Sequence, residues 1–179
     1  MQSLFSALVE PKAPKDVSFP LTEQDDIEFH ASREALIDWL RTQVKKYDLK
    51  DESTKKALRD KVGIYQKKTQ ALLVAAVAQG KTLQQARIGM MIAHFESLSP
   101  DIRKRGMVQG KHLMTERMNP NHIKEAADRA LAVHNKELAE IRKLKTDKDR
   151  EAWVKRNLQK AETDVPAFLK PKKEGMQEL

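Results

Sequence analysis

The sequence contains no cysteine, and only 5% of its residues are aromatic. The absence of cysteine excludes disulfides, thiolate zinc sites, iron–sulfur clusters and cysteine nucleophiles. Strands with alternating polarity and many aromatic side chains are also missing. The chain is instead rich in Ala, Leu, Lys, Glu, Gln and Arg, which favour helix. The composition therefore predicts an all-α protein with five to six helices around one core.

Long apolar segments are absent as well. No run approaches the roughly 20 apolar residues that a membrane-spanning helix needs. The first residues, MQSLFSALVE, lack the basic leader of a secretory signal. We therefore expect no membrane partner, and a chain that works in the cytoplasm or inside a particle assembled in the cytoplasm.

Motifs that carry catalysis or cofactor binding are also missing. The sequence has no G-x-x-x-x-G-K-[ST], no dinucleotide glycine fingerprint and no H-E-x-x-H, and no serine lies in a nucleophile elbow. Two His-x-x-Glu pairs, which begin at His122 and His134, belong to one predicted helix and cannot converge on a metal. We therefore predict no cofactor, no metal and no enzymatic activity. A carboxylate site assembled by the fold is the minor alternative.

What the chain has in excess is positive charge, with 34 basic residues, 26 acidic residues and a net charge of +8. Residues 61–120 carry ten bases and three acids, whereas residues 1–30 carry two bases and six acids. A basic surface attracts polyanions such as nucleic acid. The acidic N-terminal segment can mask that surface or dock on a neighbouring copy, and ordinary surface variation explains the asymmetry equally well.

Prolines and hydrophobic periodicity divide the chain into three parts. Several prolines interrupt regular structure near the N-terminus, where Phe19 and Leu21 can pin an extended segment to the surface. Apolar residues then recur at helical spacing. We predict an extended acidic arm at 1–31, a helical domain at 32–163 and an extended tail at 164–179. The expected helices cover about 32–47, 54–79, 82–98, 120–145 and 147–163.

The segment LLVAAVAQGKTLQQARIGMM, residues 72–91, has strong signals for a turn between two helices. Gly80 is placed to end the first helix in a left-handed turn. Thr82 and Gln85 have the spacing of a capping box, which starts the next helix. The segment is therefore either a buried helical hairpin or a helix-turn-helix that reads DNA.

A DNA-reading helix-turn-helix would direct Thr82, Gln84 and Arg87 outward from the second helix, because Gln and Arg pair well with adenine and guanine. Two positions disagree with that motif. Lys81 replaces the apolar residue that usually follows the turn glycine, and Gly89 replaces a branched apolar residue. The buried hairpin is therefore the favoured interpretation, and a DNA-binding regulator is the alternative.

The weakest helix prediction is the one that would begin after Ser99. Ser99 and Pro100 are a good helix start, but Gly106 and Gly110 each cost about 1 kcal/mol against alanine inside a helix. The stretch RKRGMVQGKH is therefore either a helix or a loop. Its glycines would let backbone amides approach a phosphate.

The basic residues in the middle of the chain are the candidate nucleic-acid site. Lysine and arginine contact phosphate oxygens without reading the base sequence, which favours generic binding. A solvated basic face, or salt bridges to Asp25, Asp26 and Glu28, is the plain alternative. The predicted nucleic-acid-binding residues are Arg103, Lys104, Arg105, Lys111, Lys67, Lys68, Lys81 and Arg87.

Together these observations predict a non-enzymatic helical assembly or structural protein that contacts nucleic acid non-specifically. A component or scaffold of a virus-like or phage-like particle fits this pattern. Its partners would be the phosphate backbone of nucleic acid and, through the terminal arms, another protein or other copies of the chain, so we expect a homo-oligomer. The alternative is a DNA-binding regulator that uses the degenerate helix-turn-helix at 72–91.

Overall fold

In the computed structural model, which describes residues 10–44, 50–112 and 119–161, every regular element is a helix. The all-α prediction is therefore confirmed for these residues. The predicted tail at 164–179 and the start of the predicted arm lie outside the described part. The helices are α2 (Glu23–Val44), α3 (Glu52–Ala78), α4 (Leu83–Glu96), α5 (Pro100–His112), α6 (Pro120–Ile141) and α7 (Asp147–Ala161).

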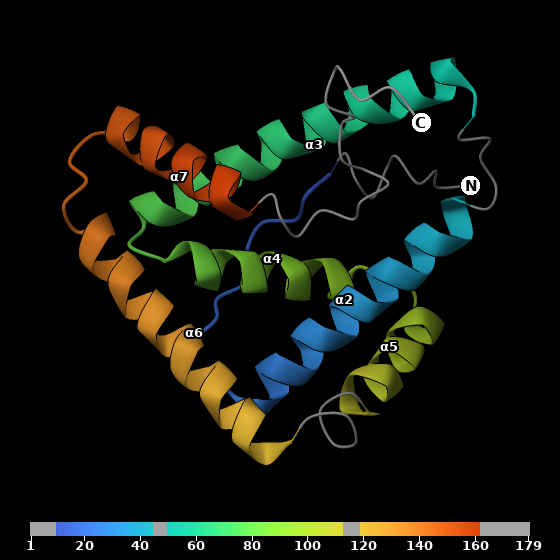
Figure 1. The fold of residues 1–179 in the computed structure, drawn as a ribbon, viewed down its shortest axis with the longest axis horizontal. Helices are drawn as coiled ribbons and strands as arrows, with labels where there is room; N and C mark the ends of the chain where they lie inside the picture. Colours follow the sequence, from blue (N-terminus) through green and yellow to red (C-terminus); the bar gives the residue numbers. More distant parts are fainter. Residues whose placement is uncertain (1–9, 45–49, 113–118, 162–179) are drawn as a thin grey trace, which may run out of the picture.

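α4 is the central helix of the fold (Figure 1). α2, α3 and α6 each pack directly against it. α5 packs on α2 and α7 packs on α3, so these two helices lie on opposite sides of α4. Buried apolar side chains follow α4 from Leu83 through Ile92 to Phe95. The prediction of helices around one core is therefore confirmed.

The largest buried cluster joins the end of α3 to the start of α4 and to α7. Val77, Leu83 and Val154 are each at most 2% exposed, and burial of such a side chain stabilises the fold by about 1.5–3 kcal/mol. Trp153 is buried beside them, and its indole Nε1 donates a hydrogen bond of 2.9 Å to Glu140 Oε2. The apolar end of α3 thus buries Leu73, Ala76 and Val77, whereas its alanines Ala71, Ala75 and Ala78 are exposed.

The turn between α3 and α4 has the predicted structure. Gly80 has a φ of 82°, the left-handed conformation that glycine adopts at low cost. Thr82 accepts a hydrogen bond from the Gln85 backbone, and the Gln85 side chain accepts one from the Thr82 backbone, which completes the capping box. The helical hairpin predicted at residues 72–91 is therefore present.

α2 begins at Glu23, earlier than the start predicted near Ser32. Asp25 Oδ2 accepts hydrogen bonds from the backbone N–H of Thr22 at 3.1 Å and from its hydroxyl at 2.7 Å. The Asp25 backbone N–H donates in return to Thr22 Oγ1 at 3.2 Å. Acidic residues of the predicted arm instead occupy the first turn of a helix, where the helix dipole favours negative charge.

Residues 100–112 form a helix and not a loop, because their two glycines let α5 lie close against α2. A Cβ atom at Gly106 would lie 2.8 Å from the Ala31 carbonyl oxygen. One at Gly110 would lie 2.9 Å from the Ala31 nitrogen. Phe95 is buried in the same contact region together with Ala31. Close packing therefore offsets the weak helix propensity of the two glycines.

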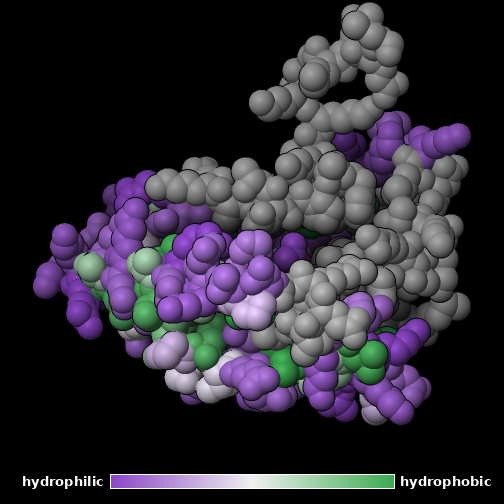
Figure 2. Space-filling view, turned by 60° about the horizontal axis from the view of Figure 1, so that its bottom comes forward, coloured by the Kyte–Doolittle hydropathy of each residue, from purple (hydrophilic) through white to green (hydrophobic). Residues whose placement is uncertain are grey.

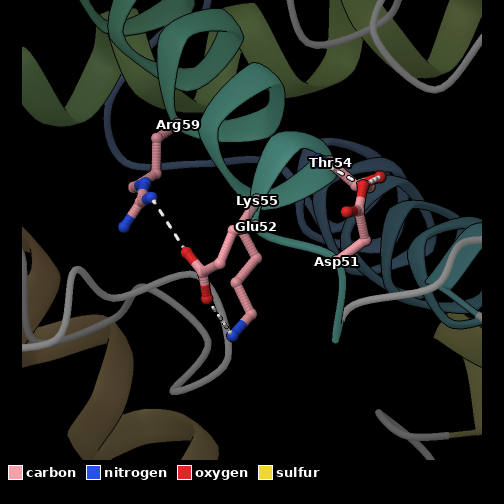
Figure 3. A network of polar contacts seen from close by, with 5 residues as sticks. All are labelled: Asp51, Glu52, Thr54, Lys55 and Arg59. Carbon is pink, nitrogen blue, oxygen red and sulfur yellow. Dashed lines mark hydrogen bonds and ion pairs between the residues drawn. The ribbon is translucent and has the colours of Figure 1, made fainter.

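α3 begins at Glu52 with Asp51 as its N-cap, slightly before the predicted start. Asp51 Oδ2 accepts a hydrogen bond of 3.0 Å from the Thr54 backbone N–H (Figure 3). Hydrogen bonds from the Ser53 and Thr54 hydroxyls are the main cause that lowers the pKa of Asp51 to about 2. Glu52 forms ion pairs with Lys55, one turn further on, and with Arg59, two turns further on. This first turn is thus held by local contacts alone.

The surface is mostly hydrophilic on the face that Figure 2 presents, with hydrophobic residues visible between hydrophilic ones. No helix in residues 10–44, 50–112 and 119–161 is long and apolar enough to cross a membrane. The large apolar side chains that stand out from the described surface are Ile64, Val108, Leu131 and Val133.

Candidate nucleic-acid interface

α5 carries the basic stretch that the sequence singles out. Lys104, Arg105 and Lys111 are exposed. Arg103 is half-buried, and its Nε atom is buried. The glycines on the other side of α5 face α2 and so fix which side of the helix points outward. α5 therefore presents a row of cations to solvent.

The exposed face of α5 is cationic along most of its length. Lys104 and Lys111 occupy the same side of the helix, about 10 Å apart along its axis. Val108 lies between them and is 64% exposed. The only acidic residue of α5 is Asp101, in its first turn. Such a face suits the phosphates of a nucleic-acid backbone, and α5 carries no Phe, Tyr or Trp on which a base could stack.

Lys67 and Lys68 lie on a different part of the molecule. Both are exposed on α3, which packs on α4 and α7. In Figure 1, α3 and α5 lie on opposite sides of α4. The structure therefore does not bring these two lysines together with the cations of α5, and the predicted residues do not form one continuous surface.

Lys81 is engaged by the N-terminal segment. Its Nζ forms an ion pair with Asp16, and Lys81 itself is half-buried. The hydrogen bond from Lys81 is the main cause that lowers the pKa of Asp16. An acidic residue of the predicted arm thus covers one of the predicted phosphate-binding cations. The predicted arm therefore reaches Lys81 through Asp16, just before the start of α4.

Those acids, Asp25, Asp26 and Glu28, belong to the first turns of α2. Asp25 caps the helix, as described above, and Glu28 accepts a hydrogen bond of 2.7 Å from Gln24 Nε2. Burial raises the pKa of Asp26. The hydrogen bond to Glu96 is the main cause that raises the pKa of Lys15 in the N-terminal segment, and the charges of Glu28 and Asp25 raise it further.

Arg87 is half-buried on α4 and faces α6. Burial raises the pKa of Glu137 on α6, and the positive charge of Arg87 acts in the opposite direction. The Glu137 carboxylate also accepts a hydrogen bond of 3.2 Å from the backbone N–H of Gln84. Arg87 therefore belongs to the contact between α4 and α6 rather than to the row of cations on α5.

The face of α4 that a DNA-reading helix would use is covered by α6. Thr82, which that motif would direct outward, is fully buried, and its Oγ1 lies 3.0 Å from His134 Nδ1. Gln84 is half-buried under the Glu137 carboxylate. The outward orientation expected of Thr82 is therefore wrong. His134 and Glu137, which have the spacing of a metal-ligand pair, act as partners for the start of α4.

The N-terminal segment lies along α4, a contact that sequence patterns did not locate. The Lys15 backbone N–H donates a hydrogen bond of 3.1 Å to the Gly89 carbonyl oxygen. A Cβ atom at Gly89 would collide with the Lys15 carbonyl oxygen. The prediction that Phe19 pins this segment is confirmed, because its ring stacks on His134. Gly89, which does not fit the helix-turn-helix motif, was the feature of the sequence that could have indicated this contact.

Comparison of the chain with models of known protein families gives no match. Comparisons with curated proteins and with solved structures give no match either.

Proposed function

We propose that this chain is a non-enzymatic helical assembly protein that contacts nucleic acid through its phosphates, as a component or scaffold of a virus-like or phage-like particle. The observation that supports the proposal is the exposed row of Lys104, Arg105 and Lys111 on α5. These side chains project from a helix whose glycines pack directly against α2. A polyanion can therefore contact them without rearrangement of the core.

Binding by such a row depends on salt and not on base sequence. Each cation that contacts a phosphate releases condensed counterions, and log K falls with log salt by about 0.9 per contact on duplex DNA. Lysine and arginine on phosphates carry no sequence information directly. The protein should therefore bind different duplexes with similar affinity.

The test is a salt titration of DNA binding by the full chain. Replacing Lys104, Arg105 and Lys111 by Ala should weaken binding and reduce the salt slope by up to about 2.7. The control replaces Lys67 and Lys68, which are also exposed but lie on α3, and should reduce the slope by clearly less than the roughly 1.8 that the loss of two phosphate contacts would give. An unchanged slope in the α5 variant would show that α5 is not the phosphate-binding surface.

A competition measurement separates this function from that of a DNA-binding regulator. A regulator binds its own site roughly 10³-fold or more tightly than other DNA. The assembly protein should show no such preference in a selection from random duplexes. Because α6 covers Thr82 and Gln84, the regulator would first have to uncover α4.

A further inference from the structure

The buried side of α7 fixes which of its residues face outward. Trp153 and Val154 are 4% and 0% exposed and pack in the cluster that includes the end of α3. The Trp153 indole Nε1 also donates a hydrogen bond of 2.9 Å to Glu140 Oε2 of α6. Because a helix turns by about 100° per residue, Lys148 and Lys155 lie on the side of α7 away from this contact. Both lysines are exposed, so α7 presents them to solvent.

The outer side of α7 repeats the arrangement of cations found on α5. Lys148 and Lys155 are seven residues apart, about 10 Å along the helix axis, as Lys104 and Lys111 are on α5. Arg156 is exposed next to Lys155, and an exposed arginine likewise adjoins a lysine of the α5 row. We call Lys148, Lys155 and Arg156 the α7 face.

The acids near the α7 face leave its charge largely uncompensated. Residues 142–156 carry seven basic and three acidic side chains. Asp147 pairs with Arg150, with 2.7 Å between Oδ1 and Nη1, and Asp149 occupies the first turn of α7, where the helix dipole favours an acid. The third acid, Glu151, is exposed. Among the residues that the structure describes, no acid forms an ion pair with the α7 face.

The α7 face is separate from the cations of α5. α7 packs on α3 and α5 packs on α2, on opposite sides of α4 (Figure 1). The turn that leads into α7 adds Lys143 and Lys145, both exposed. Leu144, between them, packs against the largest buried cluster and so anchors the turn. Positive charge therefore continues from this turn along α7.

We propose that the α7 face is a second surface that contacts the phosphates of nucleic acid, distinct from the row on α5. Lysine and arginine bind phosphate oxygens without reading the bases. Trp153 is the only aromatic residue of α7 and is buried, so the face suits the backbone of a duplex and not base stacking. The inference takes its class of partner from the proposed function, but it does not require α5 to be a contact surface.

The test removes the α5 row first, so that the remaining binding reports on other surfaces. The α5 variant of the salt titration should still bind a duplex of random sequence at low salt. Adding Lys148→Ala, Lys155→Ala and Arg156→Ala to it should reduce the remaining salt slope by up to about 2.7.

The matched control adds Lys124→Ala, Arg129→Ala and Lys136→Ala to the same α5 variant. These residues are also two exposed lysines and an exposed arginine on a helix, α6, so the control removes the same charge. Its salt slope should fall by clearly less. Urea unfolding should give similar midpoints for both proteins, because every substituted side chain is exposed.

A substitution of opposite sign gives a second readout. Glu151 lies one turn from each lysine of the α7 face, and its carboxylate repels a phosphate. Glu151→Gln in the α5 variant should therefore raise the affinity for the duplex several-fold. Glu125→Gln, at an exposed position of α6, is the control and should change the affinity clearly less.

The outcomes separate this inference from the proposed function. Equal salt slopes for the α7 and α6 variants, or no binding by the α5 variant, would overturn the α7 face as a contact surface. An unchanged slope in the α5 variant itself would overturn only the contact proposed for α5. If polyglutamate displaced the duplex at an equal concentration of charge, the α7 face would instead be assigned to an acidic protein partner, and the inference would be wrong.

Discussion

At the scale of single residues, His134 joins three segments that are distant in the sequence. It lies on α6, contacts the capping residue Thr82 of α4 and stacks on Phe19 of the N-terminal segment. The hydroxyl of Thr82 accepts from the Gln85 backbone and can donate its proton to a neutral imidazole. Protonation of His134 would therefore remove an acceptor from this buried contact.

Stability should fall on mild acidification because of His134. Burial lowers the pKa of this imidazole below its ordinary value of 6.5. A proton therefore binds the unfolded chain more readily than the folded chain. The contribution of His134 to the free energy of unfolding is complete above pH 6.5 and is lost as the pH falls toward the lowered pKa. Urea unfolding between pH 8 and pH 5.5 measures this loss.

The matched variant for that measurement is His134→Gln, which keeps a polar group near Thr82 but does not titrate. Its free energy of unfolding should fall less steeply with acidification than that of the original chain. His94, whose pKa burial also lowers, keeps its own pH dependence in both proteins. Burial raises the pKa of Glu137, which acts in the opposite sense in both. Equal slopes for the two proteins would contradict the role given to His134.

At the scale of elements, the contact between α2 and α5 depends on residues without side chains. Gly106 and Gly110 place the α5 backbone directly against Ala31 of α2. This close crossing determines which side of α5 is buried. It therefore determines that Lys104 and Arg105 face solvent. The candidate interface thus depends on two glycines that do not themselves contact nucleic acid in the proposal.

Substitution of these glycines should be destabilising although alanine is the better helix former. Gly106→Ala puts a methyl group 2.8 Å from the Ala31 carbonyl oxygen, and overpacking of this kind costs about 1–3 kcal/mol. Gly63→Ala on α3 is the control, because nothing lies within 4 Å of a Cβ atom there. The Gly63→Ala variant should have a free energy of unfolding about 0.5–1 kcal/mol higher than that of the original chain. Urea unfolding that ranks the two variants in the reverse order would contradict this helix contact.

Element boundaries show where sequence patterns are reliable. Gly80, Thr82 and Gln85 predict the turn between α3 and α4 correctly, because the bonds that form it connect residues close in sequence. The start of α2 is missed, because Thr22 and Asp25 form a cap with an aspartate in place of the usual Glu or Gln. The prolines of that region suggested an arm, although the capping pattern at Thr22 favours a helix.

At the scale of the whole molecule, the proposed function depends both on assembly of several copies and on positive charge. The chain has a net charge of +8, and α5 concentrates part of it on one exposed helix. Lys67 and Lys68 add a second exposed basic position on the other side of α4. Because these two lysines are separate from the cations of α5, they serve as the control surface in the salt titration.

The purified protein should carry nucleic acid at low salt and release it at high salt. Screening shortens the range of charge interactions from about 10 Å at 0.1 M salt to about 3 Å at 1 M. Light scattering combined with absorbance at two wavelengths should show a complex above the mass of a single chain at low salt. At high salt the nucleic-acid absorbance should disappear while a protein oligomer remains. A single-chain mass under both conditions would contradict the assembly part of the proposed function.

The sequence by itself determined the helices, the turn at Gly80 and the location of the positive charge, because propensity, capping and composition act between neighbouring residues. It also indicated the basic stretch of α5, of which Lys104, Arg105 and Lys111 are exposed. Only the tertiary structure decided that Lys81 pairs with Asp16, that Arg87 faces α6 and that the Gly89 carbonyl accepts a hydrogen bond from the N-terminal segment. Each of these contacts joins residues far apart in the chain, and no local pattern specifies which distant groups will meet when the helices pack.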